Sequence, residues 1–534
     1  MSQMDSQTYD YIVVGAGSAG SVLANRLTAS GKHTVLLLEA GRPDHPWTRV
    51  PVGFARLIEN PKANWLYESE PEAATGQRNI PVPRGKLLGG SSAINGMVFV
   101  RGQAQDFDTW AQLGNRGWSY RDVLPFFRGM ENYGSGEDEF RGREGPLQVT
   151  DLEERGPLYD AIIAAAKEAG IDYNADYNGA VQDGISMTQA TIRKGRRMST
   201  ARCYLDPARD RTNLTIVTGA HTDGLILEGK RCLGVRYTVK GSQREARAGR
   251  EVVVSAGAIN SPQLLELSGI GQPEMLAKHG IEVHHALPGV GENLRDHYAP
   301  RMKWSVTARG QTYNDTARGL RMVFQALRYA FKGTGLLGLP ASPIRAYVRT
   351  RPGLTSPDAG MSWIPFLVKD GFKLDDQSGL TVITHPLRSE SKGSIHIGSG
   401  DSKRPPTIRF NFLSAELDGE ITVAAMRIVR QIMAAPALAA MGGTEIAPGP
   451  ALADDGELLD WVKDTAETTY HPVGTCKMGS DDMAVVDDQL RVHGIQGLRV
   501  ADASIMPTLT SGNTNAPSIM IGEKAASMVL EAAA

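Results

Sequence analysis

The apolar positions near the N-terminus predict a strand, a glycine-rich turn and a helix in direct succession. Residues 11–14 form a continuous apolar run that is typical of a buried strand, and the turn Gly15 to Gly20 follows at once. Val22, Leu23 and Leu27 then share one side of a helix. A second apolar run, 34–38, predicts another strand that ends in Glu39. This order of elements is typical of an α/β domain.

Two later groups of short apolar segments predict further sheets. The first group reads as short alternating strands with turns at Gly229 and Gly241; its members are 215–217, 224–227, 234–237 and 252–254. The second group contains strand candidates at 361–368, 380–386 and 393–397. The chain is therefore expected to hold more than one sheet.

Between these groups the sequence predicts a basic amphipathic helix. Its apolar positions at helical spacing are Leu320, Val323, Phe324, Leu327 and Phe331. From Asp315 to Asp358 there is no acidic residue between the two ends, but there are Arg318, Arg321, Arg328, Lys332, Arg345, Arg349 and Arg351. Such a helix can lie on an anionic membrane, although its apolar side more often faces a core.

Composition narrows the class of protein. The chain has 534 residues with 57 Lys and Arg against 59 Asp and Glu, a net charge of −2, which disfavours a nucleic-acid binder. This length favours two domains. Three widely spaced cysteines exclude a thiolate metal site, and no metal is expected. The first ten residues lack the apolar core of a signal peptide, so the expected location is the cytoplasm, with peripheral contact to the inner membrane left open.

The glycine turn has the chemistry of a phosphate cradle. Gly15 permits a tight turn, Gly17 permits close approach of a pyrophosphate, and Gly20 permits close packing of helix and strand. Glu39, at the end of the second strand, is placed to accept ribose hydroxyls. The alternative is a turn that simply needs glycines. The motif by itself leaves FAD and NAD open.

Longer motifs resemble the glucose-methanol-choline (GMC) family of flavin oxidoreductases, with bacterial choline and primary-alcohol dehydrogenases as the nearest likeness. The segments that carry the resemblance are GKLLGGSSAIN (85–95), GAINSPQLLELSGIG (257–271), GVGENLRDH (289–297), YHPVGTCKMG (470–479) and LRVADASIMP (498–507). They run nearly from end to end of the chain.

The resemblance implies an α/β fold (α+β overall), with a Rossmann-type FAD-binding domain and an inserted substrate domain of antiparallel sheet plus helices. The FAD-binding domain is expected to comprise 1–155, 198–299 and 461–534. The substrate domain is expected to comprise 156–197 and 300–460. The strands of 215–254 would then form a small sheet under the adenine.

The resemblance also implies bound FAD. Relatives with a covalent flavin carry a His before the Asn of the second glycine segment, whereas this chain has Ile94, so dissociable FAD is expected. Asp502 suits the ribityl hydroxyls, or it is a helix cap. The expected cofactor contacts are Gly15, Gly17, Ser18, Ala19, Gly20, Glu39, Ala40, Leu88, Gly90, Ser91, Asn95, Gly96, Met97, Val98, Thr222, Ala256, Gly257, Asp502, Ala503, Asn513 and Thr514.

The family's reactive pair corresponds to His471 and Asn513. His471 is expected to take the hydroxyl proton of a primary or otherwise accessible alcohol while a hydride passes to flavin N5, giving an aldehyde. Asn513 would orient the alcohol and stabilise the oxyanion. The alternative is a satisfied polar histidine and a turn asparagine. His297 is interpreted as structural and Cys476 as buried packing.

Substrate and electron acceptor stay open. In related dehydrogenases an acid precedes the strand that corresponds to 347–349, whereas this chain has Pro343-Ile344-Arg345-Ala346 there. This departure from the family pattern disfavours choline and favours a neutral or carboxylate-bearing alcohol. Choline dehydrogenase or oxidase, and a flavin-containing lyase or fatty-acid photodecarboxylase, are the alternatives. A dehydrogenase is favoured over an oxidase, and a quinone-type acceptor and O2 are both retained. The sequence does not indicate an oligomeric state.

Overall fold

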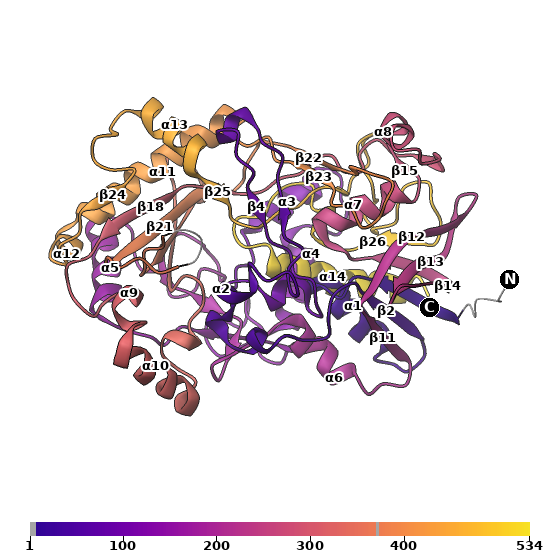
Figure 1. Cartoon of the computed structure of the whole chain (residues 1–534), viewed down its shortest axis with the longest axis horizontal. Coiled ribbons are helices and arrows are strands. Elements are labelled where there is room, and N and C mark those ends of the chain that lie inside the picture. Colours follow the sequence, from indigo (N-terminus) through magenta and orange to yellow (C-terminus); the bar gives the residue numbers. More distant parts are fainter. Residues whose placement is uncertain (1–6, 370–372, 534) are drawn as a thin grey trace.

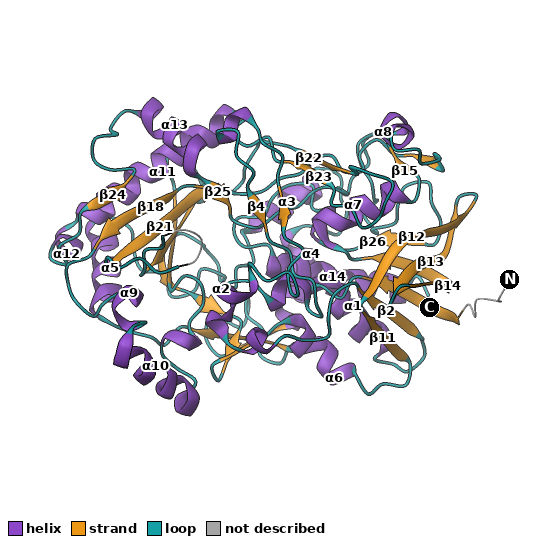
Figure 2. Ribbon diagram, in the orientation of Figure 1, coloured by secondary structure: helices purple, strands orange, loops and turns teal. Residues whose placement is uncertain are grey.

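The computed structural model describes residues 7–369 and 373–533. Two sheets occupy opposite ends of the molecule, and helices and long loops connect and cover them (Figures 1 and 2). Residues 1–6, 370–372 and 534, which the predicted domain ranges include, lie outside the described residues. The domain boundaries stay a prediction.

The larger sheet contains the two strands predicted near the N-terminus. Its order is β11-β2-β1-β14-β13-β12, and β26 also pairs with β14. Strands β11, β2, β1, β14 and β26 run parallel, and the buried runs of β1 and β2 pair from Tyr11 with Val35 to Val14 with Leu38. The bounds are β1 Gln7–Val14, β2 Val35–Glu39, β11 Leu214–Thr218, β12 Ala220–Glu228, β13 Arg231–Val239, β14 Ser242–Val254 and β26 Leu498–Val500.

The strands of 215–254 do not form a separate small sheet, so that expectation was wrong. β11 pairs in parallel with β2, and β14 is long enough to pair antiparallel with β13 from Ser242 to Arg247 and parallel with β1 from Ala246 to Val254. One continuous strand therefore joins the antiparallel hairpins to the parallel sheet. The short apolar runs indicated where strands lie but not how long they are.

Helices α1 (Ser18–Thr28) and α14 (Asn515–Glu531) pack together against this sheet. Both are almost wholly buried, which agrees with their continuous apolar and small residues. Because they begin near the carboxyl ends of β1 and β26, their first turns face the centre of the molecule. The carboxyl edge of a parallel sheet is where such folds bind ligands.

The second sheet has six antiparallel strands in the order β24-β18-β21-β20-β19-β7. One face, including Met302 and Trp304, packs in a core with α5 and α11, while alternate residues such as Arg301 and Lys303 point the other way. The bounds are β7 Gly184–Met187, β18 Arg301–Ser305, β19 Ile344–Val348, β20 Ala359–Ile364, β21 Gly379–Pro386, β24 Glu445–Ala447, α5 Pro157–Glu168 and α11 Glu416–Ala434.

Two of the three predicted substrate-domain strands belong to this sheet. The third, predicted at 393–397, is β22 (Ser394–His396), which pairs with β23 (Thr407–Arg409) in a separate two-stranded ribbon. The alternation of apolar and polar residues does not distinguish a strand of a two-stranded ribbon from a strand of a larger sheet, because the two differ only in the strands with which they pair.

The predicted amphipathic helix is α10 (Gly319–Lys332), which projects from the lower left of the molecule in Figure 1. None of its residues is buried, and Leu320 and Phe331 are 88% and 84% exposed. The expectation that its apolar side faces a core is therefore wrong.

The remaining α-helices include α4, which packs against α14 and α3, and α13, which packs against α11. Their bounds are α2 Phe54–Leu57, α3 Ala104–Gln112, α4 Tyr120–Met130, α6 Asp206–Ala208, α7 Gly257–Leu267, α8 Pro273–Lys278, α9 Tyr313–Thr316, α12 Pro436–Ala439 and α13 Asp455–Thr465.

Candidate functional site

A cavity of about 1140 Å³ lies between the two sheets and receives residues from both. It brings His471, Arg345 and most of the expected cofactor residues together. Those on its wall are Gly15, Gly17, Ser18, Ala19, Glu39, Ala40, Gly90, Ser91, Asn95, Gly96, Met97, Val98, Thr222, Ala256, Gly257, Asp502, Ala503, Asn513 and Thr514. Gly20 and Leu88 are not on it.

The two exceptions have structural positions. A side chain at Gly20 would collide with the carbonyl of Gly15, so this glycine lets α1 approach the preceding turn. Leu88 is buried in the core of the larger sheet. Both residues pack behind the residues that line the cavity. The motif alone could not distinguish residues that line the cavity from residues that pack behind them.

Two glycine turns, which contain Gly15 and Gly90, meet at one end of the cavity. We call this end the nucleotide end. Gly15 has φ +97°, and a Cβ there would lie 2.5 Å from the Ser255 carbonyl oxygen. Gly90 has φ +52°, and its Cβ would lie 2.7 Å from the Cα of Gly17. Only glycine fits at Gly15 and at Gly90, so at these two positions the backbone itself forms the cradle.

Glu39 lies beside this cradle and is buried. Its carboxylate accepts hydrogen bonds from the backbone N–H of Ala16 at 3.1 Å and of Gly41 at 2.7 Å. Burial raises the pKa of Glu39 to about 7, against the opposing effect of these two donors. Further donors, such as the hydroxyls of a ribose, would stabilise the ionised form.

Asp502 acts as a cap, the alternative recognised for it from the sequence. One carboxylate oxygen accepts from the N–H of Gly257 at 2.8 Å and the hydroxyl of Ser261 at 2.6 Å, and the other accepts from the N–H of Ser504. The residue also lines the cavity. The cap and a contact with a ligand hydroxyl are compatible, since a carboxylate has about four acceptor positions.

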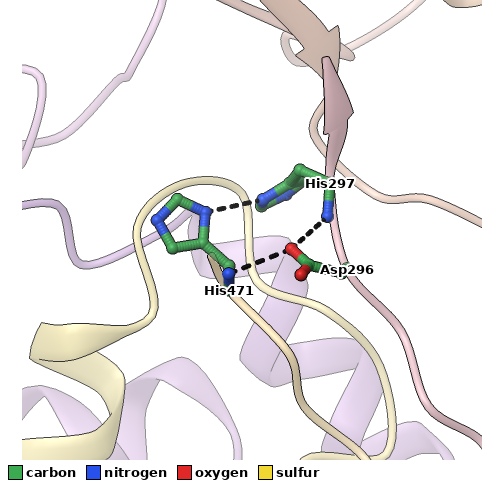
Figure 3. Close-up of side chains that lie close together, drawn as sticks. All are labelled: Asp296, His297 and His471. Atoms are coloured by element: carbon green, nitrogen blue, oxygen red, sulfur yellow. Dashed lines mark hydrogen bonds between the residues drawn. The ribbon is translucent and has the colours of Figure 1, made fainter. Parts of the chain in front are cut away.

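The other end of the cavity, which we call the reactive end, holds the imidazole of His471. Its Nε2 lies 2.9 Å from Asn513 Nδ2, and its Nδ1 lies 2.8 Å from Thr469 Oγ1 and 3.1 Å from His297 Nδ1. The rings of His297 and His471 are perpendicular. Figure 3 shows His471 on a loop facing His297, with Asp296 below.

The carboxylate of Asp296 holds this loop in place. One of its oxygens accepts from the backbone N–H of His297 at 2.7 Å and of His471 at 3.0 Å, and the other accepts from the Thr468 hydroxyl. The backbone at Tyr470 has φ +69°, which is costly for a side chain of this size. Sequence reasoning did not single out Asp296, whose position in GVGENLRDH was its only signal.

The hydrogen bonds of His297 determine which nitrogen of His471 carries its proton. His297 Nε2 lies 2.9 Å from the carbonyl oxygen of Leu387, so in the neutral ring this nitrogen is the donor and Nδ1 is the acceptor. His471 Nδ1 must then donate, which leaves an unprotonated Nε2 toward the cavity and Asn513. This tautomer is assigned from the network. His297 is thus more than the structural residue expected.

Three histidines gather at this end in their neutral form. Burial lowers the pKa of His471 and of His297 well below the usual value, and it lowers that of His385 to about 4. The nearby cations Arg84 and Arg345 add to the effect on His471. A neutral imidazole with an unprotonated Nε2 can accept a proton.

The wall formed by the second sheet adds positive charge. Strand pairing places Arg345 opposite Ser362 and Arg301 opposite Ile383. These residues and Lys303 lie on the face of the sheet that lines the cavity. Arg301 pairs with Glu467 at the cavity wall. Sequence reasoning missed Arg301, Lys303 and His385, because the register that aligns them with the cavity is set by pairing between distant strands.

Asp296, His297 and His471 place one potential metal-ligand atom each within 4.8 Å of one another. The Asp296 oxygens already accept three hydrogen bonds, and the facing His nitrogens satisfy each other. We interpret the cluster as a hydrogen-bonded network.

Comparisons with known proteins agree with the geometry. Two GMC oxidoreductase models match residues 9–299 and 389–522. The chain is 44% identical over 530 residues to an oxygen-dependent choline dehydrogenase of Yersinia pseudotuberculosis, covering 98% of this chain and 93% of that protein. A Pseudomonas fluorescens protein of the same name is 43% identical over 539 residues, covering 98% and 94%.

Solved structures share the fold over nearly the whole chain. A pyridoxine 4-oxidase from Mesorbium loti has a TM-score of 0.88 and 31% identity, covering 97% of this chain and 98% of that one. A formate oxidase of Aspergillus oryzae has a TM-score of 0.91 and 26% identity, covering 99% of each chain.

Proposed function

The chain belongs to the GMC oxidoreductase family and is an FAD-dependent alcohol oxidoreductase, and from this premise we propose that His471 is its general base and Asn513 its oxyanion partner. The observation that carries this proposal is the 2.9 Å contact between His471 Nε2 and Asn513 Nδ2 on the cavity wall. A primary alcohol would place its oxygen within reach of both groups and replace this direct contact.

The nucleotide end fits FAD. The cradle of Gly15, Gly17 and Gly90 would hold the pyrophosphate, and Glu39 would bind the adenosine ribose. Asn513 Oδ1 is buried without a hydrogen-bond partner in the part of the chain that the structure describes, which is suited to a donor on a bound ligand. When bound, FAD supplies the redox chemistry by accepting the hydride at N5.

The residues of the reactive end perform the proton chemistry. His471 Nε2 takes the hydroxyl proton, and its Nδ1–H stays directed at His297 Nδ1. The Asn513 amide donates to the oxygen as negative charge develops there, which stabilises the alkoxide without competing for the proton. The product is an aldehyde.

Dissociable FAD is part of the proposal. Ile94 lines the cavity next to Asn95, and its aliphatic side chain has no nucleophile to bond to a flavin. Acid precipitation should release all the yellow colour into the supernatant. Flavin that stays on the denatured polypeptide would contradict this part of the proposal.

Anaerobic mixing with alcohols tests the proposed reaction. Primary alcohols should bleach the flavin absorbance of the purified holoprotein, and an aldehyde should form in equal amount. Absence of bleaching across short, long-chain, aromatic and cationic alcohols would contradict the proposal and favour a non-redox use of the flavin.

We also propose that α10 rests on an anionic lipid surface. There the reduced protein would pass its electrons to a quinone-type acceptor in preference to O2. Its apolar residues are exposed in one stripe, and Arg321 and Lys332 beside them are exposed as well. Arg328 and Arg318 pair with Glu154 and Asp376. Among the described residues, none of the helices is long and apolar enough to span a bilayer.

Vesicle binding tests the proposed lipid contact. The double variant Phe324→Ser and Phe331→Ser should lower sedimentation with phosphatidylglycerol vesicles at least about tenfold. Val283→Ser, an exposed valine outside α10, is the matched control. Anaerobic flavin reduction should be unchanged in both. Equal sedimentation of wild type with phosphatidylcholine and phosphatidylglycerol vesicles would contradict the charge argument, and faster reoxidation by O2 than by a quinone analogue would contradict the proposed acceptor.

A further inference from the structure

We propose that the alcohol oxidised by this protein carries a carboxylate, and that Arg345 binds this group. The inference rests on the proposed function, since it concerns the same cavity and names the class of its substrate. It starts from the surroundings of one guanidinium in the second sheet.

Arg345 is only 5% exposed and lines the cavity. Its Nε donates to the Tyr347 hydroxyl at 3.2 Å and its Nη1 to the Ser342 hydroxyl at 3.4 Å. Both acceptors are neutral, both contacts are long, and among the described residues no carboxylate forms an ion pair with Arg345. A guanidinium has five N–H donors, and among the described residues Arg345 engages two of them while its side chain lines the cavity.

Other buried arginines show how unusual this is. Arg141 pairs with Glu131 and Asp176, and Arg499 pairs with Glu251. Arg197 has no carboxylate either, but its Nη1 donates to the carbonyl and the side chain of Asn95 at 2.6 and 2.8 Å. Arg197 thus forms short hydrogen bonds within the protein through Nη1, although its Nε has no partner among the described residues, and it lies off the cavity wall, whereas Arg345 forms only long contacts and lines the cavity. A buried cation without an anion is costly unless a ligand supplies one.

The charges around Arg345 do not supply that anion. Arg301 and Lys303 lie on the same cavity-facing side of the sheet, and Glu467 is already paired with Arg301. His471, His297 and His385 are neutral and add no negative charge. This wall would repel the quaternary ammonium of choline. It favours a carboxylate, whose two oxygens match the paired N–H groups of a guanidinium.

A carboxylate at Arg345 would also affect the base. The positive charge of Arg345 is one of the causes that lower the pKa of His471, so neutralising it would raise that pKa toward its ordinary value. His471 would become a stronger base only after a substrate of the correct charge has bound.

The test compares matched substrates on the holoenzyme. A series of ω-hydroxyalkanoates of about three to eight carbons, 1-alkanols of equal length and choline are mixed anaerobically with wild type, Arg345→Met and Arg345→Lys. Arg349→Met is the control, because Arg349 pairs with Asp183 outside the cavity wall. Flavin content and circular dichroism confirm that each variant is folded.

Wild type should be reduced by the best hydroxyalkanoate about 100-fold more efficiently, as rate constant over Kd, than by its alkanol. Arg345→Met should abolish this preference, Arg345→Lys should restore part of it, and Arg349→Met should keep all of it. Equal efficiency for acid and alkanol in wild type, or equal losses for both in Arg345→Met, would overturn the proposal.

A binding measurement separates this proposal from the proposed function. Hexanoate, which has no hydroxyl group, should perturb the flavin spectrum of wild type and Arg349→Met but not of Arg345→Met. If hexanoate binds in this way and no alcohol bleaches the flavin, the carboxylate site stands and alcohol oxidation fails. If alcohols bleach the flavin and hexanoate does not bind, the carboxylate site fails and alcohol oxidation stands.

Discussion

The two ends of the cavity are built by different means. The nucleotide end consists of backbone from two glycine turns that lie close to their own strands and helices, with Gly90 against Gly17. The reactive end consists of side chains from separate segments, including 296–297, 469–471 and Asn513, which a buried carboxylate and hydrogen bonds between histidines hold in place. Binding at the nucleotide end is therefore sensitive to added side-chain volume, whereas catalysis at the reactive end is sensitive to the loss of single polar atoms.

At the nucleotide end, one added methyl group should cause a large loss of FAD affinity. Gly90→Ala places a Cβ 2.7 Å from the Cα of Gly17, so we expect FAD affinity to fall at least about 100-fold, with the protein purified mostly colourless. Gly229→Ala is the matched control, since Gly229 also has positive φ but no atom within 4 Å of the added Cβ. Equal flavin content in the two variants would contradict the expected collision between the added methyl group and Gly17.

At the reactive end, Asn513→Ala should slow anaerobic flavin reduction about 100-fold and leave FAD bound, because one donor to the developing alkoxide is lost. Asn513→His restores a donor and should stay within about tenfold of wild type. Stopped-flow absorbance measures both. A purely structural asparagine would instead give loss of flavin, or equal defects in both variants.

A smaller effect is expected at His297, which positions the base without touching the substrate. His297→Leu removes the acceptor for His471 Nδ1–H, and we expect about tenfold slower reduction and an altered acidic limb of the pH profile. His297→Asn can present an oxygen near the position of Nδ1 and should recover most of the rate. If Leu and Asn behave alike in rate and pH profile, the tautomer assignment is wrong.

The smallest effect is a shift in pH dependence. His471 must be neutral to accept a proton, and its pKa is lowered mainly by burial, so the rate of reduction should stay constant at neutral pH and fall only in acid, as pH passes below that lowered pKa. Arg345→Met removes a positive neighbour and should move the acidic limb to higher pH. A limb that moves to lower pH would contradict the sign of this interaction.

The same contrast explains what could be predicted from the sequence. The strand, turn and helix around Gly15 are contiguous, so their residues indicated the cradle and Glu39 directly. Family motifs pointed to His471 and Asn513. The roles of Asp296 and His385 depend on how the 296–297 segment, the 469–471 loop and β21 meet, and the pairing of distant strands leaves no local pattern. The sequence left open whether the apolar side of α10 faces a core or a membrane, and only the folded structure shows that none of its residues is buried among the described residues.

The proton acceptor is the central claim, and single-turnover reduction of a His471→Ala variant with bound FAD tests it most directly. The account predicts normal flavin content, a rate of reduction by the best primary alcohol about 1000-fold below wild type at neutral pH, and partial recovery with added imidazole. Reduction within a few-fold of the wild-type rate, in a variant that retains its flavin, would contradict it.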